Sequence, residues 1–306
     1  MMLIDIGINL MNPAFDRDRE AVIGRAAAAG VSPLIITGSS VESSAGAAGF
    51  AERYNRENAG SVYATAGVHP HNARHWKNET PGILRELLAR DPVVAAGECG
   101  LDYNRNFSSP RDQRRCFEAQ LLLAEECRLP LFLHERDAFE DLSSMIGSFR
   151  RGREGAVNMV IHCFTGTEGE LETYLESGCY IGITGWIGDE RRGARLLPLL
   201  EKIPPDRLLL ETDAPYLLPR NMARRSPRSG GASRPGDGSG ETPGPGPAGR
   251  SGRNESAYLV HIAEFAARIL GKDPETLAAE TRANTLRFFG LPAEVRPYDG
   301  VGTASF

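Results

Sequence analysis

The sequence has few cysteines and no long hydrophobic run. Its five cysteines are odd in number and scattered, and no two of them form a CxxC pair. This pattern indicates reduced thiols in a cytosol-like compartment. No apolar run approaches the roughly 18 residues that a membrane span needs. The start, MMLIDIGINL, has no basic segment and carries Asp5 within its apolar stretch, so we expect neither a signal peptide nor a membrane helix.

Lysine is also scarce. Only three of the 35 basic residues are lysines, at positions 77, 202 and 272. None follows a strand-like run, which argues against a carbamylated-lysine metal bridge and against Schiff-base chemistry. The sequence has no GxSxG elbow and no GxxxxGK loop, and no cysteine lies in a thiolate-activating context. The net charge of −5 does not show the global basicity that is usual for nucleic-acid binders.

Eight strand-like apolar runs alternate with helical segments. The runs are residues 3–9, 33–38, 62–68, 93–98, 130–134, 158–162, 180–184 and 208–213. Helix-start signals lie between them: Asp16 before a helix that Gly30 would end, and the pairs Thr80-Pro81 and Ser109-Pro110 as N-cap and first helical residue. Near-continuous apolar strands in this order predict an α/β protein, a (β/α)₈ TIM-type barrel. An open doubly wound sheet would favour a glycine-rich loop after the first strand, and DIGINLMNP does not supply one.

We expect one domain, residues 1–290. Within it, residues 226–252 are rich in glycine, proline and arginine and are expected to form a flexible insertion at the carboxyl end of the barrel. The arginines there either attract a phosphate backbone or reflect an unselective arginine-rich insert. Residues 291–306 lack periodicity and are expected to form a loose tail.

Four ionisable residues close apolar runs: Glu98 (VVAAGEC), His134 (PLFLHE), His162 (NMVIHC) and Asp213 (LLLETDAP). In a barrel, the carboxyl ends of the strands meet at one mouth, so these side chains should face one cavity. Each alone has an ordinary explanation, such as a core histidine or a turn aspartate. Together they are costly to bury unless they are paired or bound to a metal. Two imidazoles and two carboxylates therefore predict a divalent-metal site and metal-assisted hydrolysis.

Several motifs extend this pattern along most of the chain. They are AGVHPH (66–71), GECGLDYNRNF (97–107), LHERD (133–137), IHCFTG (161–166), YIGITGW (180–186), ETDAPYLLP (211–219), RNES (253–256) and ANTLRFFG (283–290). In order and content they resemble the TatD family of metal-dependent deoxyribonucleases, which belongs to the amidohydrolase-like, metallo-dependent hydrolase barrels. The family usually reads RNEP where this chain has RNES.

The resemblance implies that Glu98, His134, His162 and Asp213 bind metal. Most members carry HxH on the first strand, whereas this chain has Gly7 and Asn9, like the branch typified by bacterial TatD. Asn9 offers only a neutral oxygen, and we group it with the substrate-binding residues. A site with fewer nitrogen ligands favours Mg²⁺, with Mn²⁺ as an alternative and Zn²⁺ disfavoured, as one or two ions.

The resemblance also suggests roles for individual residues. Asp213 would act as general base, Glu98 would bridge two ions if two bind, and His69 and His71 would contact or protonate the scissile phosphate. Tyr103 either stacks on a base or packs in its loop. Arg136 either contacts phosphate or pairs with a carboxylate. Arg220 and Arg253, in the family-like flanks, are further candidates for substrate binding. Glu135, where many relatives have cysteine, is expected to point away from the cavity.

The function that this resemblance implies is a 3′→5′ exodeoxyribonuclease acting on single-stranded DNA, with RNA as a further substrate. The alternatives are a metal-dependent ester hydrolase, such as an aminoacyl-tRNA deacylase, and a metal-binding protein without turnover. We expect a monomer with no membrane partner, located in the cytoplasm, or in the nucleus if the source is eukaryotic.

Overall fold

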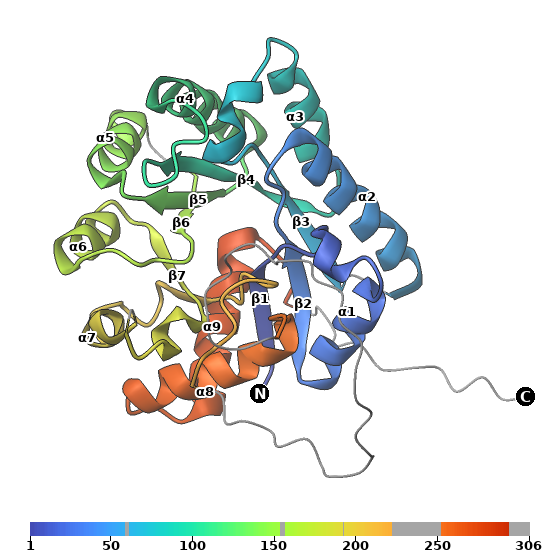
Figure 1. Cartoon of the computed structure of the whole chain (residues 1–306), viewed down its shortest axis with the longest axis vertical. Helices are drawn as coiled ribbons and strands as arrows, with labels where there is room; N and C mark the ends of the chain where they lie inside the picture. Colours follow the sequence, from blue (N-terminus) through green and yellow to red (C-terminus); the bar gives the residue numbers. More distant parts are fainter. Residues whose placement is uncertain (59–60, 154–156, 192, 222–251, 294–306) are drawn as a thin grey trace, which may run out of the picture.

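Figure 1 shows the computed structural model, in which a ring of helices surrounds a central sheet. It describes residues 1–58, 61–153, 157–191, 193–221 and 252–293. The expected insertion, apart from Gly252, and the expected tail from residue 294 onwards lie outside these ranges. Within the described residues no helix is long and apolar enough to cross a membrane.

The eight expected strands are present and all pair in parallel, in the order β1 to β8. They are β1 Leu3–Ile8, β2 Val31–Ile36, β3 Val62–Ala66, β4 Val93–Asp102, β5 Leu131–Arg136, β6 Met159–Ile161, β7 Tyr180–Ile183 and β8 Leu208–Leu210. A parallel bridge between Ile8 and Ala214 brings the end of β1 against the segment after β8. The barrel prediction is confirmed, with β4 longer and β8 shorter than expected.

Helices follow the strands and cover the outside of the barrel. They are α1 Arg19–Ala28, α2 Val41–Asn58, α3 Thr80–Leu88, α4 Pro110–Cys127, α5 Phe139–Arg150, α6 Glu168–Glu176, α7 Leu197–Leu200, α8 Leu259–Ile269 and α9 Pro274–Phe289. Short 3₁₀ turns join them: η1 Pro13–Phe15, η2 Pro70–His75, η3 Gly185–Gly188, η4 Ala194–Leu196 and η5 Ser256–Tyr258.

The helix-start signals are partly confirmed. Ser109 caps α4, and its hydroxyl accepts a hydrogen bond from the Asp112 amide. The N-cap of α3 is Glu79, one residue before the expected Thr80. The first helix begins at Arg19, later than Asp16 predicted, because Asp16 is the C-cap of η1 and residues 16–18 form a turn before the N-cap Asp18. Gly30 follows that helix with a φ of 84°, a conformation that glycine adopts without strain.

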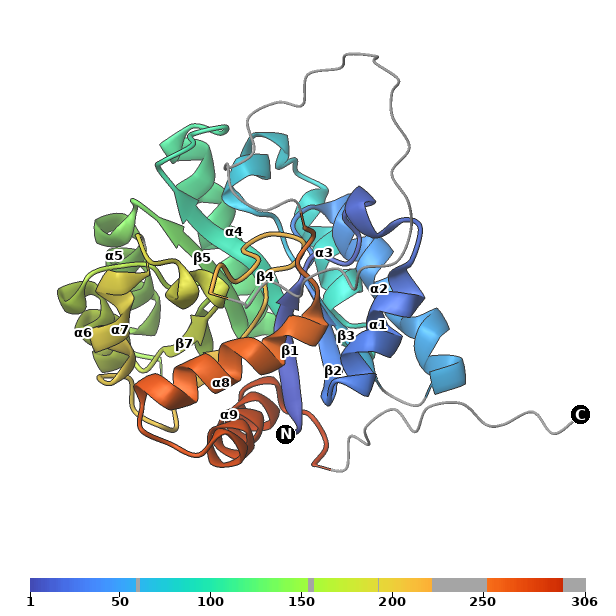
Figure 2. The ribbon, with the colours of Figure 1, turned by 60° about the horizontal axis from the view of Figure 1, so that its bottom comes forward.

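Alternate residues of the strands enter two separate apolar cores. Ile6, Phe132 and Leu209 belong to an inner cluster, which α9 completes with Phe288 and Phe289. Their strand neighbours pack outward against the helices. Figure 2 shows α9 beside the start of β1. Since these aromatic rings fill the amino-terminal end of the barrel, the cavity described below opens at the carboxyl end of the strands.

Candidate active site

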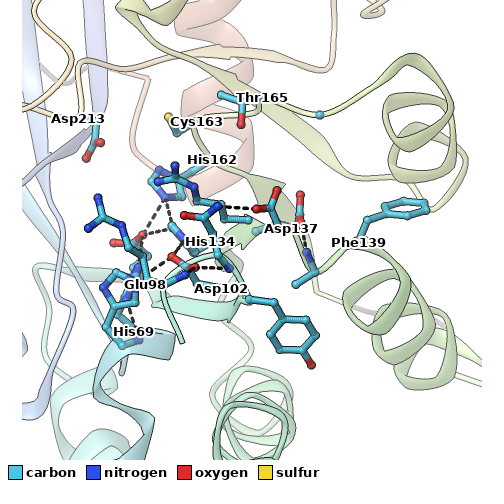
Figure 3. Close-up of a pocket in the computed structure, with 18 of the residues that line it drawn as sticks. His69, Glu98, Asp102, His134, Asp137, Phe139, His162, Cys163, Thr165 and Asp213 are labelled. Atoms are coloured by element: carbon cyan, nitrogen blue, oxygen red, sulfur yellow. Dashed lines mark hydrogen bonds and ion pairs between the residues drawn. The ribbon is translucent and has the colours of Figure 1, made fainter. Parts of the chain in front are cut away.

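A cavity of about 1120 Å³ lies at the carboxyl ends of the strands. Nine of the eleven predicted site residues line it: Asn9, His69, His71, Glu98, Tyr103, His134, Arg136, His162 and Asp213. They come from the ends of β1, β3, β4, β5, β6 and β8, or from the loops that follow these strands. Figure 3 shows most of the polar side chains directed toward a common centre.

Glu98 lies at that centre, buried in the middle of β4. Its Oε1 lies 2.8 Å from His162 Nε2, 2.9 Å from His134 Nδ1 and 3.4 Å from His69 Nε2. Burial alone would raise the pKa of Glu98, but the adjacent imidazoles outweigh it and hold the pKa well below its usual range. A carboxylate oxygen and several ring nitrogens thus converge on one small volume, as ligands of a divalent cation must.

The far nitrogens of two imidazoles face carboxylates. His134 Nε2 lies 3.4 Å from Asp102 Oδ2, and His162 Nδ1 lies 3.4 Å from Glu211 Oε2. A carboxylate holds the ring proton on the nitrogen that faces it, so the opposite nitrogen keeps a free lone pair. Neutral His134 and His162 would therefore direct lone pairs toward Glu98. This donor set fits a divalent metal.

His69 has the opposite arrangement. Its Nδ1 accepts a hydrogen bond from the His71 amide at 3.0 Å, which places the proton of the neutral ring on Nε2. Burial lowers the pKa of His69 to about 3, so the ring is neutral near pH 7. One ring nitrogen each of His69 and His134 and a Glu98 oxygen lie within 4.8 Å of one another. Nevertheless, a protonated Nε2 suits a hydrogen-bond donor, and we assign His69 that role and not ligation.

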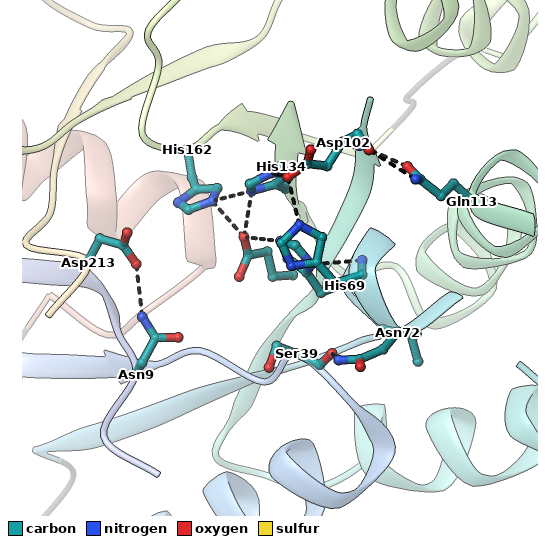
Figure 4. A network of polar contacts seen from close by, with 12 residues as sticks. Asn9, Ser39, His69, Asn72, Asp102, Gln113, His134, His162 and Asp213 are labelled. Carbon is teal, nitrogen blue, oxygen red and sulfur yellow. Dashed lines mark hydrogen bonds and ion pairs between the residues drawn. The ribbon is translucent and has the colours of Figure 1, made fainter. Parts of the chain in front are cut away.

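Asp213 lies just beyond β8 and on the cavity wall. Its Oδ1 accepts a hydrogen bond of 2.8 Å from Asn9 Nδ2, which Figure 4 shows. Burial raises the pKa of Asp213 to about 7; His162 lowers it, and the nearby carboxylates of Glu98 and Glu211 raise it further. A pKa near 7 suits a group that takes a proton from water at neutral pH.

Two carboxylates of the site were missed by the sequence reasoning. Asp102, at the end of β4, accepts from His71 Nε2 at 2.7 Å as well as facing His134. Glu211 is fully buried and accepts a bond of 2.5 Å from the Cys163 amide. Both lie inside the quoted motifs, and an acidic residue at an apolar strand end was the available signal. Their partners are histidines of the site, so they orient the side chains that the sequence did predict.

Tyr103 and Arg136 both line the cavity. The Tyr103 hydroxyl donates to Asp141 Oδ2 at 2.6 Å and accepts from Arg114 at 3.1 Å, which fixes the ring beside the cavity. Arg136 is exposed, and within the described part of the chain no carboxylate pairs with its guanidinium. The free guanidinium favours the phosphate-binding alternative for Arg136.

Arg220 and Arg253 do not line the cavity. Arg220 pairs with Asp189 at 3.1 Å, and Arg253 donates two bonds of 2.7 Å to Asp18. A contact of either with substrate stays a prediction. Glu135 differs from expectation, because it lines the cavity edge and accepts a bond from the Ala138 amide that begins α5.

The fold and the site together define a (β/α)₈ hydrolase barrel with a candidate divalent-metal site at its mouth. The family model described as TatD related DNase matches residues 4–290, and the chain therefore belongs to this family.

Relatives and solved structures agree with this assignment. The chain is 46% identical to a 3′-5′ ssDNA/RNA exonuclease TatD from Enterobacter lignolyticus, over 94% of this chain and 99% of the relative. A protein of the same name from Cronobacter sakazakii is also 46% identical, over 94% and 97% of the two chains. A TatD family hydrolase from Entamoeba histolytica superposes with a TM-score of 0.77 at 27% identity, covering 95% of this chain and 99% of that one. The Escherichia coli TatD homolog YJJV gives 0.76 at 26% identity, covering 95% and 98%.

Proposed function

We propose that this protein is a metal-dependent 3′→5′ exonuclease that acts on single-stranded DNA, with RNA as a further substrate. The family and the names of relatives at 46% identity over almost the whole chain support this activity. The single structural observation that carries it is the convergence of His134 Nδ1 and His162 Nε2 on Glu98 Oε1, with each far nitrogen facing a carboxylate.

Glu98, His134, His162 and Asp213 would hold the ion, for which we propose Mg²⁺. A bound divalent ion neutralises charge on phosphoryl oxygens and lowers the pKa of water, which is the chemistry that phosphodiester hydrolysis needs. The remaining steps belong to the protein's own side chains.

Asp213, on the cavity wall beside the proposed ion, takes the proton of the attacking water. Asn9 donates to Asp213 Oδ1 and so orients the other carboxylate oxygen toward the cavity. The protonated Nε2 of His69 donates to a phosphoryl oxygen, and the exposed Arg136 contacts the phosphate of a neighbouring nucleotide. Tyr103, held by Asp141 and Arg114, offers a fixed ring against which a base can stack.

Hydrolysis of a 5′-labelled single-stranded oligonucleotide with Mg²⁺ tests the proposal. The wild type should give a ladder that shortens from the 3′ end, and EDTA should abolish it. Asp213→Ala should reduce the rate by roughly 10² to 10⁴-fold, since general-base catalysis contributes about that much. Folded, metal-loaded protein that leaves DNA and RNA intact would refute the nuclease, and assays on aminoacyl esters would follow.

A further inference from the structure

The RNES segment, residues 253–256, bonds to the barrel through each of its four residues. It is the first stretch after residues 222–251 that the structure describes, apart from Gly252. Arg253 and Glu255 attach the segment to η1 and α1: Arg253 donates to Asp18, the N-cap of α1, and to the Ala14 carbonyl in η1, and Glu255 accepts from Arg25 in α1. These bonds hold the RNES segment against η1 and α1, the first elements that follow β1.

Asn254 is fully buried in this segment and reaches the loop that carries Asp213. Its Nδ2 donates to the carbonyls of Thr212 at 3.0 Å and Tyr216 at 2.6 Å. Its backbone amide donates to the Pro215 carbonyl at 3.2 Å. One residue therefore holds the loop both before and after Asp213.

The Thr212 carbonyl and the Asp213 amide belong to the same peptide group. On the amide side, Asp213 N donates to the Gly7 carbonyl at 2.9 Å. Since Asn254 binds the carbonyl side, this peptide group is fixed at both edges. Asp213 itself has a φ of 52°, a left-handed conformation that costs a non-glycine residue about 1 kcal/mol or more. Such a conformation persists only where its surroundings enforce it.

Ser256 holds the same loop from a second direction. Its hydroxyl donates to Asp5 Oδ2 at 2.6 Å, and Asp5 accepts from the Thr212 amide at 2.9 Å and the Thr212 hydroxyl at 2.6 Å. A proline at position 256, as in the family pattern, has no hydroxyl to make this bond. The amide, hydroxyl and carbonyl of Thr212 are therefore all held, two through Asp5 and one by Asn254.

We propose that Asn254 is a positioning residue for Asp213: through the Thr212 and Tyr216 carbonyls it holds the catalytic carboxylate at the cavity, with Ser256 supporting it through Asp5. This inference rests on the proposed function for the role of Asp213. The position of the loop can be tested without any activity.

The experiment compares Asn254→Ala with a matched control, Asn284→Ala. Asn284 is also a buried asparagine whose Nδ2 donates to two carbonyls, those of Pro205 and Leu208, but at the opposite end of β8. In each variant two bonds from Nδ2 to carbonyls and one bond accepted by Oδ1 are lost, so the losses of stability should be similar. Hydrogen exchange by mass spectrometry without added metal follows the Asp213, Ala214 and Tyr216 amides, which are bonded to Gly7, Thr212 and Asp213.

We expect Asn254→Ala to exchange faster across residues 212–216 and not in the other strands. Its kcat should fall by roughly a hundredfold, because a misplacement of about 1 Å can cost that much, with KM nearly unchanged. Asn284→Ala should keep both the exchange of residues 212–216 and kcat. Unchanged exchange of residues 212–216 in Asn254→Ala, or equal losses of kcat in the two variants, would overturn the proposal.

If Asn254→Ala does not fold, Ser256→Ala takes its place. It should accelerate exchange in the same residues and lower kcat by a smaller factor, and unchanged exchange would again refute the account. A wild type without nuclease activity would refute the proposed function alone, since the exchange comparison would still show whether Asn254 holds the loop.

Discussion

The carboxylate of Glu211 occupies the space that a side chain at Gly7 would need. A Cβ added to Gly7 would lie 2.6 Å from Glu211 Oε2, and one added to Gly182 would lie 2.6 Å from Glu211 Oε1. Glu211 is thus confined between two glycines while it faces His162. The glycine that replaces the first histidine of the usual HxH pattern makes room for a carboxylate that orients a site histidine.

Gly7→Ala should therefore destabilise the protein, by about 1–3 kcal/mol as for overpacked cores. In a Glu211→Ala background the same substitution should cost at least about 1 kcal/mol less, because the clashing group is gone. Urea unfolding of the four proteins measures this coupling. Gly24→Ala, where an added Cβ meets nothing within 4 Å, is the control and should not destabilise. Equal costs of Gly7→Ala in both backgrounds would show that Glu211 does not limit position 7.

Asp102→Asn should weaken metal binding by roughly 10- to 100-fold, the usual effect of removing a carboxylate behind a ligating histidine. The reason is that a neutral amide replaces the charged carboxylate that fixes the proton on His134 Nε2 and raises the basicity of the ring. Calorimetric titration with Mn²⁺ measures the affinity. Asp91→Asn, at an exposed position, should bind as the wild type does. Equal affinity in the two variants would remove Asp102 from the account of the site.

Asp5 should make stability fall as pH rises. Burial raises its pKa to about 6 from 3.8, although its four hydrogen bonds from Ser256, Thr212 and Gly7 act in the opposite direction. Between about pH 4 and 6 the folded protein keeps a proton that the unfolded chain has lost, so the unfolding free energy decreases with pH and levels off above 6. The difference across this range is about 3 kcal/mol at most.

Urea unfolding in metal-free buffer, for the wild type and Asp5→Asn from pH 4 to 7.5, isolates this contribution. The stability of the wild type relative to Asp5→Asn should decrease as the pH rises. A difference that is flat, or that increases with pH, would show that Asp5 ionises at its ordinary pKa or below.

Arg136→Ala should raise KM for single-stranded DNA by roughly tenfold and reduce its dependence on salt, because one phosphate contact would be lost. The value of kcat should change much less. Arg153→Ala is the matched control, since Arg153 is an exposed arginine paired with Glu125 away from the cavity. An unchanged salt dependence in Arg136→Ala would argue against a phosphate contact.

The fold was predictable from the sequence because buried parallel strands read as apolar runs, and polar residues mark where those runs end. Glu98, His134, His162 and Asp213 were found in this way. Asp102 and Glu211 carry the same kind of signal, an acidic residue at the end of an apolar strand, but their roles could not be predicted, since these depend on which ring nitrogen faces each carboxylate.

Arg253 shows a different limit of the sequence. Its charge and its place in a family-like motif suggest a substrate contact, which stays a prediction; its ion pair with Asp18, the N-cap of α1, could not be read from the motif. The role of its neighbour Asn254 depends on its hydrogen bonds to the carbonyls of Tyr216 and Thr212. No local pattern predicts these bonds, because they join residues 38 and 42 positions apart in the sequence.

The most direct test of the metal site is a crystal structure with Mn²⁺, read by anomalous scattering. The account predicts an ion bound by Glu98, His134 Nδ1, His162 Nε2 and Asp213, with His69 Nε2 outside its coordination shell. An ion bound through His69 Nε2, or one that leaves His162 and Asp213 uncoordinated, would contradict the assignment of proton positions on which the proposed site rests.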